Sequence, residues 1–383
     1  MTNVPSNVDA HRNRFMTCYT TVSNPIARTG NPVIQHLNPI HDVMRVGVVF
    51  ATLGVCAGVL ADCECGHTIN STVRFMESLE TTFSQTTNTS VTWSSEAGIP
   101  WRAQQYNVTP AAARGPYGKA AELRNVIVSE DGLQLWVRSQ LLDDGIAQLV
   151  PMAEVVTARN DMLYGSFRVG MKTTSVNGTC GAFFFYHNNS EEIDMEFLSR
   201  EQRPNEYLVN LVNQSPESVA SGYNAVNTSD YMVYHLGFSP SQGFHEYRFD
   251  WLPDRIDLYA DEAWLTSFYQ SVPSNAGALH LINWSNGDPT WSGGPPKKDA
   301  VLTVAYVNAY FNTTTSQQQL GSCPDPTGTG STCPIPTNTS IPVNNNPPRT
   351  SSTVPTHSGG IDKVPNPWNV LFGLTAVVSC VIF

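Results

Sequence analysis

The sequence has little positive charge. Its 383 residues include 21 Lys plus Arg against 32 Asp plus Glu, which gives a formal net charge of -11. Proteins that bind nucleic acid or an anionic membrane electrostatically present a basic surface, so this balance argues against both partners. A neutral ligand fits better.

The sequence also lacks an apolar run of the roughly 20 residues that a transmembrane helix needs. Residues 44–61 instead combine a basic start, a short apolar stretch and a small-residue cleavage site ending at Ala61. We expect this segment to be a signal peptide, with the mature chain beginning at Asp62 and residues 1–43 forming a doubtful N-terminal extension. The alternative is that Met1 is the true start and the apolar stretch is an uncleaved anchor.

A second apolar stretch, over 370–383, follows a polar spacer and the small residues Ser358-Gly359-Gly360. That order is typical of a glycosylphosphatidylinositol (GPI) anchor signal, which we place at 359–383. Residues 321–358 are rich in Pro, Thr, Ser and Asn and are expected to form an extended, O-glycosylated stalk. A tail anchor is the alternative. We therefore expect a secreted protein at the cell surface or in the cell wall, held to the membrane by a lipid anchor or hydrophobic tail.

Sequons for N-glycosylation agree with export. Ten N-x-S/T sequons occur, at Asn70, Asn88, Asn107, Asn177, Asn188, Asn213, Asn227, Asn283, Asn312 and Asn338. One sequon is weak evidence, but ten beside a signal peptide are hard to reconcile with a cytosolic protein.

No cysteine pair has histidine partners at the spacing of a zinc site. The predicted mature chain contains five cysteines, Cys63, Cys65, Cys180, Cys323 and Cys333. This odd number allows at most two intrachain disulfides and leaves one thiol. Cys323 with Cys333 is the easiest local pair, and one of Cys63 or Cys65 could reach Cys180. The spacing alone does not fix the connectivity.

A sustained 3.6-residue period is absent as well. Between residues 66 and 315, short runs of β-branched and aromatic residues are separated by Gly, Pro, Asn and Asp, and many alternate with period two. The runs are Leu123–Val128, Gly132–Val137, Leu163–Gly170, Ala182–His187, Glu192–Phe197, Glu206–Val212, Phe244–Trp251, Arg255–Ala260 and Val301–Asn312. They predict one large antiparallel all-β sandwich or barrel, over residues 62–320.

Three acidic residues alternate with apolar ones in the run Glu192–Phe197. On a strand, the acids Glu192, Asp194 and Glu196 would share one face, and the apolar residues would enter the core. Four residues at ~3.3 Å rise place the two Glu backbones ~13 Å apart. Side chains that lean together would bring the carboxyl groups to ~5 Å, the separation in a retaining glycosidase. Glu192 would then be the nucleophile and Glu196 the general acid/base, with Asp194 in support.

Two other interpretations of this strand compete with catalysis. An acidic strand could simply face solvent, although no Lys or Arg between Lys172 and Arg200 offsets the like charges. Three carboxylates could also hold calcium, although the Asx/Gly spacing of a calcium loop is missing. We therefore expect no catalytic metal and no cofactor, and leave a structural calcium possible.

The run Glu192-Ile193-Asp194-Met195-Glu196 resembles the E-x-D-x-E signature of glycoside hydrolase family 16, without a bulge residue. The similarity extends over residues 66–315 and includes Phe183–Tyr186, Phe244–Trp251 and the Trp-rich segment 283–295. The resemblance implies a β-jelly roll of two curved antiparallel sheets with a concave glycan cleft. It also implies a retaining enzyme with these three acids at its site and β-1,3 or mixed β-1,3/1,4 glucan as partner. We expect a monomer.

Aromatic residues are the second component expected of a glycan site, since the apolar face of a sugar stacks on flat rings. Trp284 and Trp291 lie in segments rich in Gly, Asn and Ser, which we interpret as loops, so they are the first candidates. Tyr186 and Trp101 are weaker ones. His245 occupies a position where the family often has a histidine near the cleft, and a surface histidine is an equal alternative.

Two other functions share this pattern. A cell-wall transglycosylase of the chitin-glucan crosslinking type would use the same acids but transfer the sugar to another sugar. Phe197 departs from the pattern of those enzymes, in which Trp follows the second Glu, so hydrolysis is favoured. An inactive glycan-binding lectin is the third possibility, against which the presence of all three acids argues.

Overall fold

The computed structural model describes residues 63, 65–83, 91–92, 98–226, 228–319 and 332–336. The predicted N-terminal extension, signal peptide and C-terminal signal lie outside these residues, as does the predicted stalk apart from 332–336. In the described part, no helix is both long and apolar enough to span a bilayer. Secretion and anchoring remain predictions.

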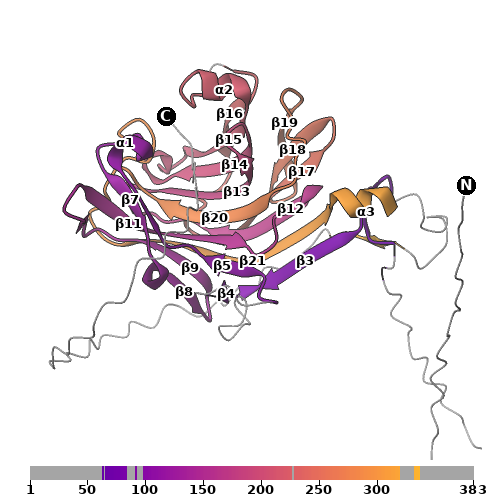
Figure 1. Ribbon diagram of the computed structural model, residues 1–383, viewed down its shortest axis with the longest axis horizontal. Coiled ribbons are helices and arrows are strands. Elements are labelled where there is room, and N and C mark those ends of the chain that lie inside the picture. Colours follow the sequence, from indigo (N-terminus) through magenta and orange to yellow (C-terminus); the bar gives the residue numbers. More distant parts are fainter. Residues whose placement is uncertain are drawn as a thin grey trace, which may run out of the picture. The chain divides into compact units, whose positions relative to one another are not determined.

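Two large β-sheets dominate the described residues (Figure 1). The larger has eleven strands, eight of them along one path. In spatial order the path is β16 (Tyr231–Leu236), β15 (Tyr207–Gln214), β14 (Glu191–Leu198), β13 (Cys180–Asn188), β20 (Ala278–Trp284), β11 (Gln148–Thr157), β5 (Trp101–Ala103) and β4 (Val91–Thr92). Beside it lie β10 (Leu142–Asp143), β7 (Gly118–Ala121) and β6 (Tyr106–Val108).

The second sheet has eight strands. Their order is β19 (Ala263–Phe268), β18 (Arg255–Ala260), β17 (His245–Leu252), β12 (Leu163–Lys172), β21 (Ala300–Asn312), β9 (Gly132–Val137) and β8 (Val126–Ser129), with β3 (Glu77–Thr82) also paired to β21. All pairings in this sheet are antiparallel, whereas β4 with β5 and β7 with β11 run parallel in the larger one. The predicted all-β sandwich of antiparallel sheets, a jelly roll, is confirmed.

The core lies between the two sheets and takes alternate side chains from each. Ile193, Met195 and Phe197 of β14 enter it from one side, and Tyr247 and Phe249 of β17 enter it from the other. A second buried cluster lies on the opposite face of the eleven-stranded sheet and includes Phe184, Ile282, Trp284 and Trp291. Side chains on both faces of this sheet are therefore buried.

A small sheet joins the two ends of the described chain. It consists of β2 (Val73–Phe75), β1 (His67–Ile69) and β22 (Cys333–Pro334), and β1 and β22 run parallel. Ile335, which lies in the predicted stalk, is 5% exposed and packs with Phe75 and Tyr310. Part of the segment that we expected to form a free stalk therefore packs onto the domain.

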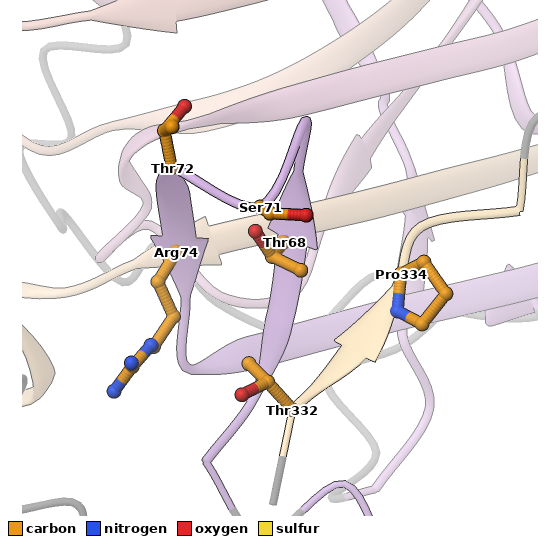
Figure 2. Close-up of a pocket in the computed structure, with 6 residues that line it drawn as sticks. All are labelled: Thr68, Ser71, Thr72, Arg74, Thr332 and Pro334. Atoms are coloured by element: carbon orange, nitrogen blue, oxygen red, sulfur yellow. The ribbon is translucent and has the colours of Figure 1, made fainter. Parts of the chain in front are cut away.

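Figure 2 shows a pocket of about 320 Å³ at this small sheet. It is lined by Thr68, Ser71, Thr72, Arg74, Thr332 and Pro334. Hydroxyl groups predominate, and none of these six residues is a carboxylate. The pocket therefore does not supply the paired acids that the predicted reaction requires.

The disulfide proposals made from the sequence are wrong. Cys63 is bonded to Cys333, 270 residues away, and Cys65 is also disulfide-bonded. Cys180 is a buried thiol in β13. The local pairing of Cys323 with Cys333 fails because the parallel pairing of β1 and β22 brings Cys333 to the N-terminal segment instead.

The described residues also include three short helices, α1 (Pro110–Ala113), α2 (Pro216–Ala220) and α3 (Thr314–Gln319), with 3-10 turns at Leu123–Asn125 and Ser199–Glu201. In α1 the Thr109 side chain accepts a hydrogen bond from the Ala112 N–H, which caps the first turn. The helix ends at Arg114, whose φ of 55° is left-handed. This early termination places Arg114 just before β7, next to the site described below.

Burial divides the sequons into two groups. The side-chain amides of Asn213, Asn283 and Asn312 are buried and donate hydrogen bonds to backbone carbonyls. Asn107 and Asn177 are exposed. A glycan on any of the three buried side chains would be incompatible with this packing, so fewer sequons support export than the sequence indicated.

Candidate active site

The three acids lie on one face of β14, as the alternation predicts. Glu192, Asp194 and Glu196 are all 0% exposed, and the intervening Ile193 and Met195 pack in the core. The register against β13 is continuous from Glu192 to Leu198, so no bulge interrupts the row. The spacing of the carboxylates is therefore that of a regular strand.

Neighbouring strands surround this row. Across from Glu192 lie Tyr186 of β13 and Gln214 of β15. Glu196 pairs with Ala182 and with Asn210. Because the side chain of Ala182 is small, residues from other strands can approach Glu196.

Burial raises the pKa of all three carboxyl groups. Loss of solvation is the largest cause in each case, and it raises the pKa of Asp194 to about 8 and those of Glu192 and Glu196 well above their usual range. The charge of Asp194 adds to the rise for both neighbours. The side chains of Glu192 and Asp194 interact, which raises the pKa of Glu192 and opposes the rise for Asp194, as expected of two carboxyl groups that share a proton.

Two cations moderate this effect, and neither was predicted from the sequence. Arg114 lowers the pKa of Glu192, and Lys119 of β7 lowers that of Glu196. Lys119 is only 2% exposed, and its ammonium lies 4.6 Å from the ring centroid of Trp284. The acidic row thus has positive partners that lie about 75 residues earlier in the chain.

Glu196 has the most elaborate surroundings of the three acids. The Cys180 Sγ lies 3.4 Å from Glu196 Oε1 and donates a hydrogen bond to it. The nearby Trp291 indole, whose N–H is a donor, also lowers the pKa of Glu196. Both donors favour the charged form, whereas burial favours the neutral form. A group balanced in this way can serve in turn as acid and as base.

The two tryptophans predicted as sugar platforms are both near the acids, but both are buried. Trp291 is 3% exposed and contacts Glu196 as described. Trp284 is 1% exposed and is the last residue of β20, so its assignment to a loop was wrong. The Asn and Ser residues that follow Trp284 indicated a loop one residue too early. Direct sugar stacking by either ring remains a prediction.

The other three candidates have different positions. Tyr186 lies beside Glu192 and donates a hydrogen bond to Asn189. Trp101 is in the core between the sheets, where its indole N–H donates to Thr81, so it is not placed to bind a sugar. His245 begins β17 in the eight-stranded sheet, stacks on Phe238 and pairs with Asp261. Of these three candidates, Tyr186 is the one that lies beside the acidic row.

The described residues also bear on the metal question. They contain no group of three or more His, Cys, Asp or Glu side chains arranged to hold a metal ion. The structural calcium considered above is untested and remains a prediction.

Comparison with known proteins identifies one family. Residues 120–317, just over half of the chain, match the family described as Glycosyl hydrolases family 16. A β-glucanase of Acetivibrio thermocellus is 30% identical over 188 residues, covering 47% of this chain and 50% of that protein. The chain therefore spans about half the length of this curated relative.

Solved structures give weaker similarities. A β-1,3-1,4-glucanase (lichenase) from a mouse hindgut metagenome is 21% identical, with a TM-score of 0.46 over 61% of this chain and 98% of that one. A Crh5 transglycosylase is 18% identical, with a TM-score of 0.43 over 61% and 84% of the two chains. Scores of this size carry no argument about activity.

Proposed function

Because this chain belongs to glycosyl hydrolases family 16, we propose that it is a retaining endo-β-glucanase that cleaves β-1,3 or mixed β-1,3/1,4 glucan. The observation that carries the proposal is the row Glu192, Asp194 and Glu196 on one face of β14. The β-glucanase named above supports the choice of substrate. In this proposal Glu192 is the nucleophile and Glu196 the general acid/base.

The first chemical step needs Glu196 protonated and Glu192 charged. Burial raises the pKa of Glu196, which keeps its proton available for the departing glycosidic oxygen. Attack requires that the proton shared by Glu192 and Asp194 move to Asp194. Arg114, which lowers the pKa of Glu192, favours this arrangement, whereas the interaction between the two carboxyl groups opposes it. Glu192 is then a carboxylate and attacks the anomeric carbon, and the covalent glycosyl-enzyme forms as the leaving group takes the proton of Glu196.

In the second step, Glu196 is charged and acts as base. The Cys180 thiol, the Trp291 indole and the Lys119 ammonium all favour its charged form. Glu196 takes a proton from the incoming water, the water oxygen bonds to the anomeric carbon, and the bond to Glu192 breaks. The product retains its β configuration and Glu196 is protonated again.

Transfer to a sugar hydroxyl instead of water is the second candidate function. The argument against it from Phe197 is weakened by the structure, because Phe197 packs between the sheets against Tyr247. Its side chain lies on the opposite face of β14 from the acids and does not touch a substrate bound there. The choice between water and sugar as acceptor therefore depends on residues other than Phe197.

The proposal includes location. A signal peptide over 44–61 and a GPI signal over 359–383 would place the enzyme at the cell surface or in the cell wall, where β-glucan is its partner. Phosphatidylinositol-specific phospholipase C should then release the protein from intact cells. Retention on the cells, together with a detectable tag placed after Phe383, would favour a tail anchor.

Product analysis tests the activity. The purified full-length protein should release oligosaccharides from β-1,3 or mixed-linkage glucan, and early products observed by nuclear magnetic resonance should be β-anomers. Addition of chito-oligosaccharide acceptors separates transfer from hydrolysis, because transfer yields hybrid products. Early α-anomers would rule out retention. Binding of glucan without any cleavage or transfer would indicate a lectin.

A further inference from the structure

A second polar network lies on the acidic face of the eleven-stranded sheet. Glu154 of β11 is 0% exposed, and both of its carboxylate oxygens are hydrogen-bonded. His280 Nδ1 lies 2.7 Å from Oε1, and the Tyr106 hydroxyl donates to Oε2. A buried carboxylate with both oxygens engaged holds its partners in fixed positions.

Aromatic contacts fix the imidazole ring as well. Its centroid lies 4.7 Å from that of Phe184 in a stacked arrangement and 5.8 Å from that of Tyr186, edge to face. Phe184 is the cross-strand neighbour of both Asp194 and His280, so the imidazole lies two strands, or about 10 Å, from Asp194. The ring is held close to the acidic row but is not part of it.

The carboxylate also selects the tautomer. Because Nδ1 bonds to a carboxylate oxygen, it carries the proton, and the second ring nitrogen of His280 remains for another partner. Within the described residues, His280 Nε2 makes no hydrogen bond, and the side chain is 14% exposed. A polar atom on a rigid ring among aromatic side chains is the kind of group that orients a ligand in a largely apolar site.

We propose that His280 Nε2 binds a hydroxyl group of a glucan unit next to the one attacked, with Glu154 and Tyr106 as positioning residues. A sugar hydroxyl can hydrogen-bond to Nε2 as donor or as acceptor, and the adjacent Tyr186 ring offers a surface for the sugar's apolar face. This subsite rests on the proposed glucanase function and extends it. It makes the enzyme favour chains that are long enough to reach His280.

The test compares two histidines that are each paired with an acid. His245 lies 2.7 Å from Asp261 in the other sheet, as His280 lies 2.7 Å from Glu154. His280→Ala should raise KM for long β-gluco-oligosaccharides about 10-fold, the loss of one hydrogen bond, with kcat nearly unchanged. A short activated aryl glycoside should show no change. His245→Ala should leave both substrates unaffected.

The outcomes separate this inference from the proposed function. If the wild-type protein cleaves no β-glucan, the proposed function fails. If the wild type is active and His280→Ala has the same KM on long chains, the subsite does not exist. Should His280→Ala fail to fold, His280→Gln preserves a polar group of similar size and should give an intermediate KM. Glu154→Gln should raise KM less than His280→Ala does. If His280→Gln and Glu154→Gln both have the KM of the wild type, the proposal is overturned.

Discussion

The two faces of β14 are equally buried but hold opposite kinds of side chain. Ile193, Met195 and Phe197 pack between the sheets, where burial stabilises the fold. Glu192 and Glu196 lie on the other face, where the same loss of solvent raises their pKa values and costs stability. The burial of the apolar face of β14 thus offsets the loss of stability from the buried acids and holds them in position.

The largest expected effect comes from removing the acids. Glu192→Ala should abolish turnover of every substrate. Glu196→Ala should slow glucan cleavage by about 10²–10⁴-fold yet retain activity on nitrophenyl glycosides, whose leaving group needs little protonation. With azide, Glu192→Ala should yield the glycosyl azide of inverted configuration and Glu196→Ala the retained one, as determined by nuclear magnetic resonance. The opposite pattern would exchange the two roles.

On the core face, the effect should be on stability. Met195 is 0% exposed between the sheets, so Met195→Ala should lower the free energy of unfolding by about 2–5 kcal/mol. Denaturant unfolding measures this, and kcat per folded molecule should change little. If Met195→Ala is as stable as the wild type but inactive, the apolar face does not serve stability alone, which would contradict this assignment.

Asp194→Asn tests the effect of one buried acid on both stability and activity. The pKa of Asp194 in the folded protein is about 8, above its ordinary value of 3.8. The contribution of Asp194 to the free energy of unfolding is therefore fully present below about pH 3.8 and is lost as pH rises through 8. Wild-type stability should therefore decline over that range, and Asp194→Asn should decline less, as measured by thermal unfolding across pH. Activity should be impaired but measurable. An unchanged pH dependence of stability would show that Asp194 is not desolvated.

The smallest effect should come from Lys119. Its charge lowers the pKa of Glu196, so Lys119→Met should raise that pKa further. Because Glu196 must be protonated to act as acid, the alkaline limb of the kcat/KM profile should move to higher pH. Lys297→Met, at an exposed lysine, is the control and should leave the limb in place. A shift to lower pH in Lys119→Met would contradict the assigned electrostatics.

Strands were predicted correctly where apolar and polar residues alternate along the sequence. The runs Gly132–Val137 and Arg255–Ala260 coincide with β9 and β18, because both alternate between more and less buried positions and are bounded by turn residues. Strands β11 and β20 were not predicted, and both are buried on both faces over most of their length. A strand covered on both sides loses the alternation that identifies it.

The same distinction applies to the site. Glu192, Asp194 and Glu196 share a strand, so local alternation predicted their common face. Lys119 and His280 reach that face through the pairing of β7 with β11 and of β11 with β20. No local signal in the sequence encodes such long-range pairing, and neither residue could have been selected without the fold.

The Cys63–Cys333 bond has a topological consequence. It closes 270 residues of separation into a covalent ring that includes both large sheets. A protease that cuts any single exposed loop within this ring leaves one connected molecule, whose two pieces separate only after reduction. For an enzyme proposed to work outside the cell, the first cut would therefore release no fragment, and the severed ends would stay within reach of their native partners.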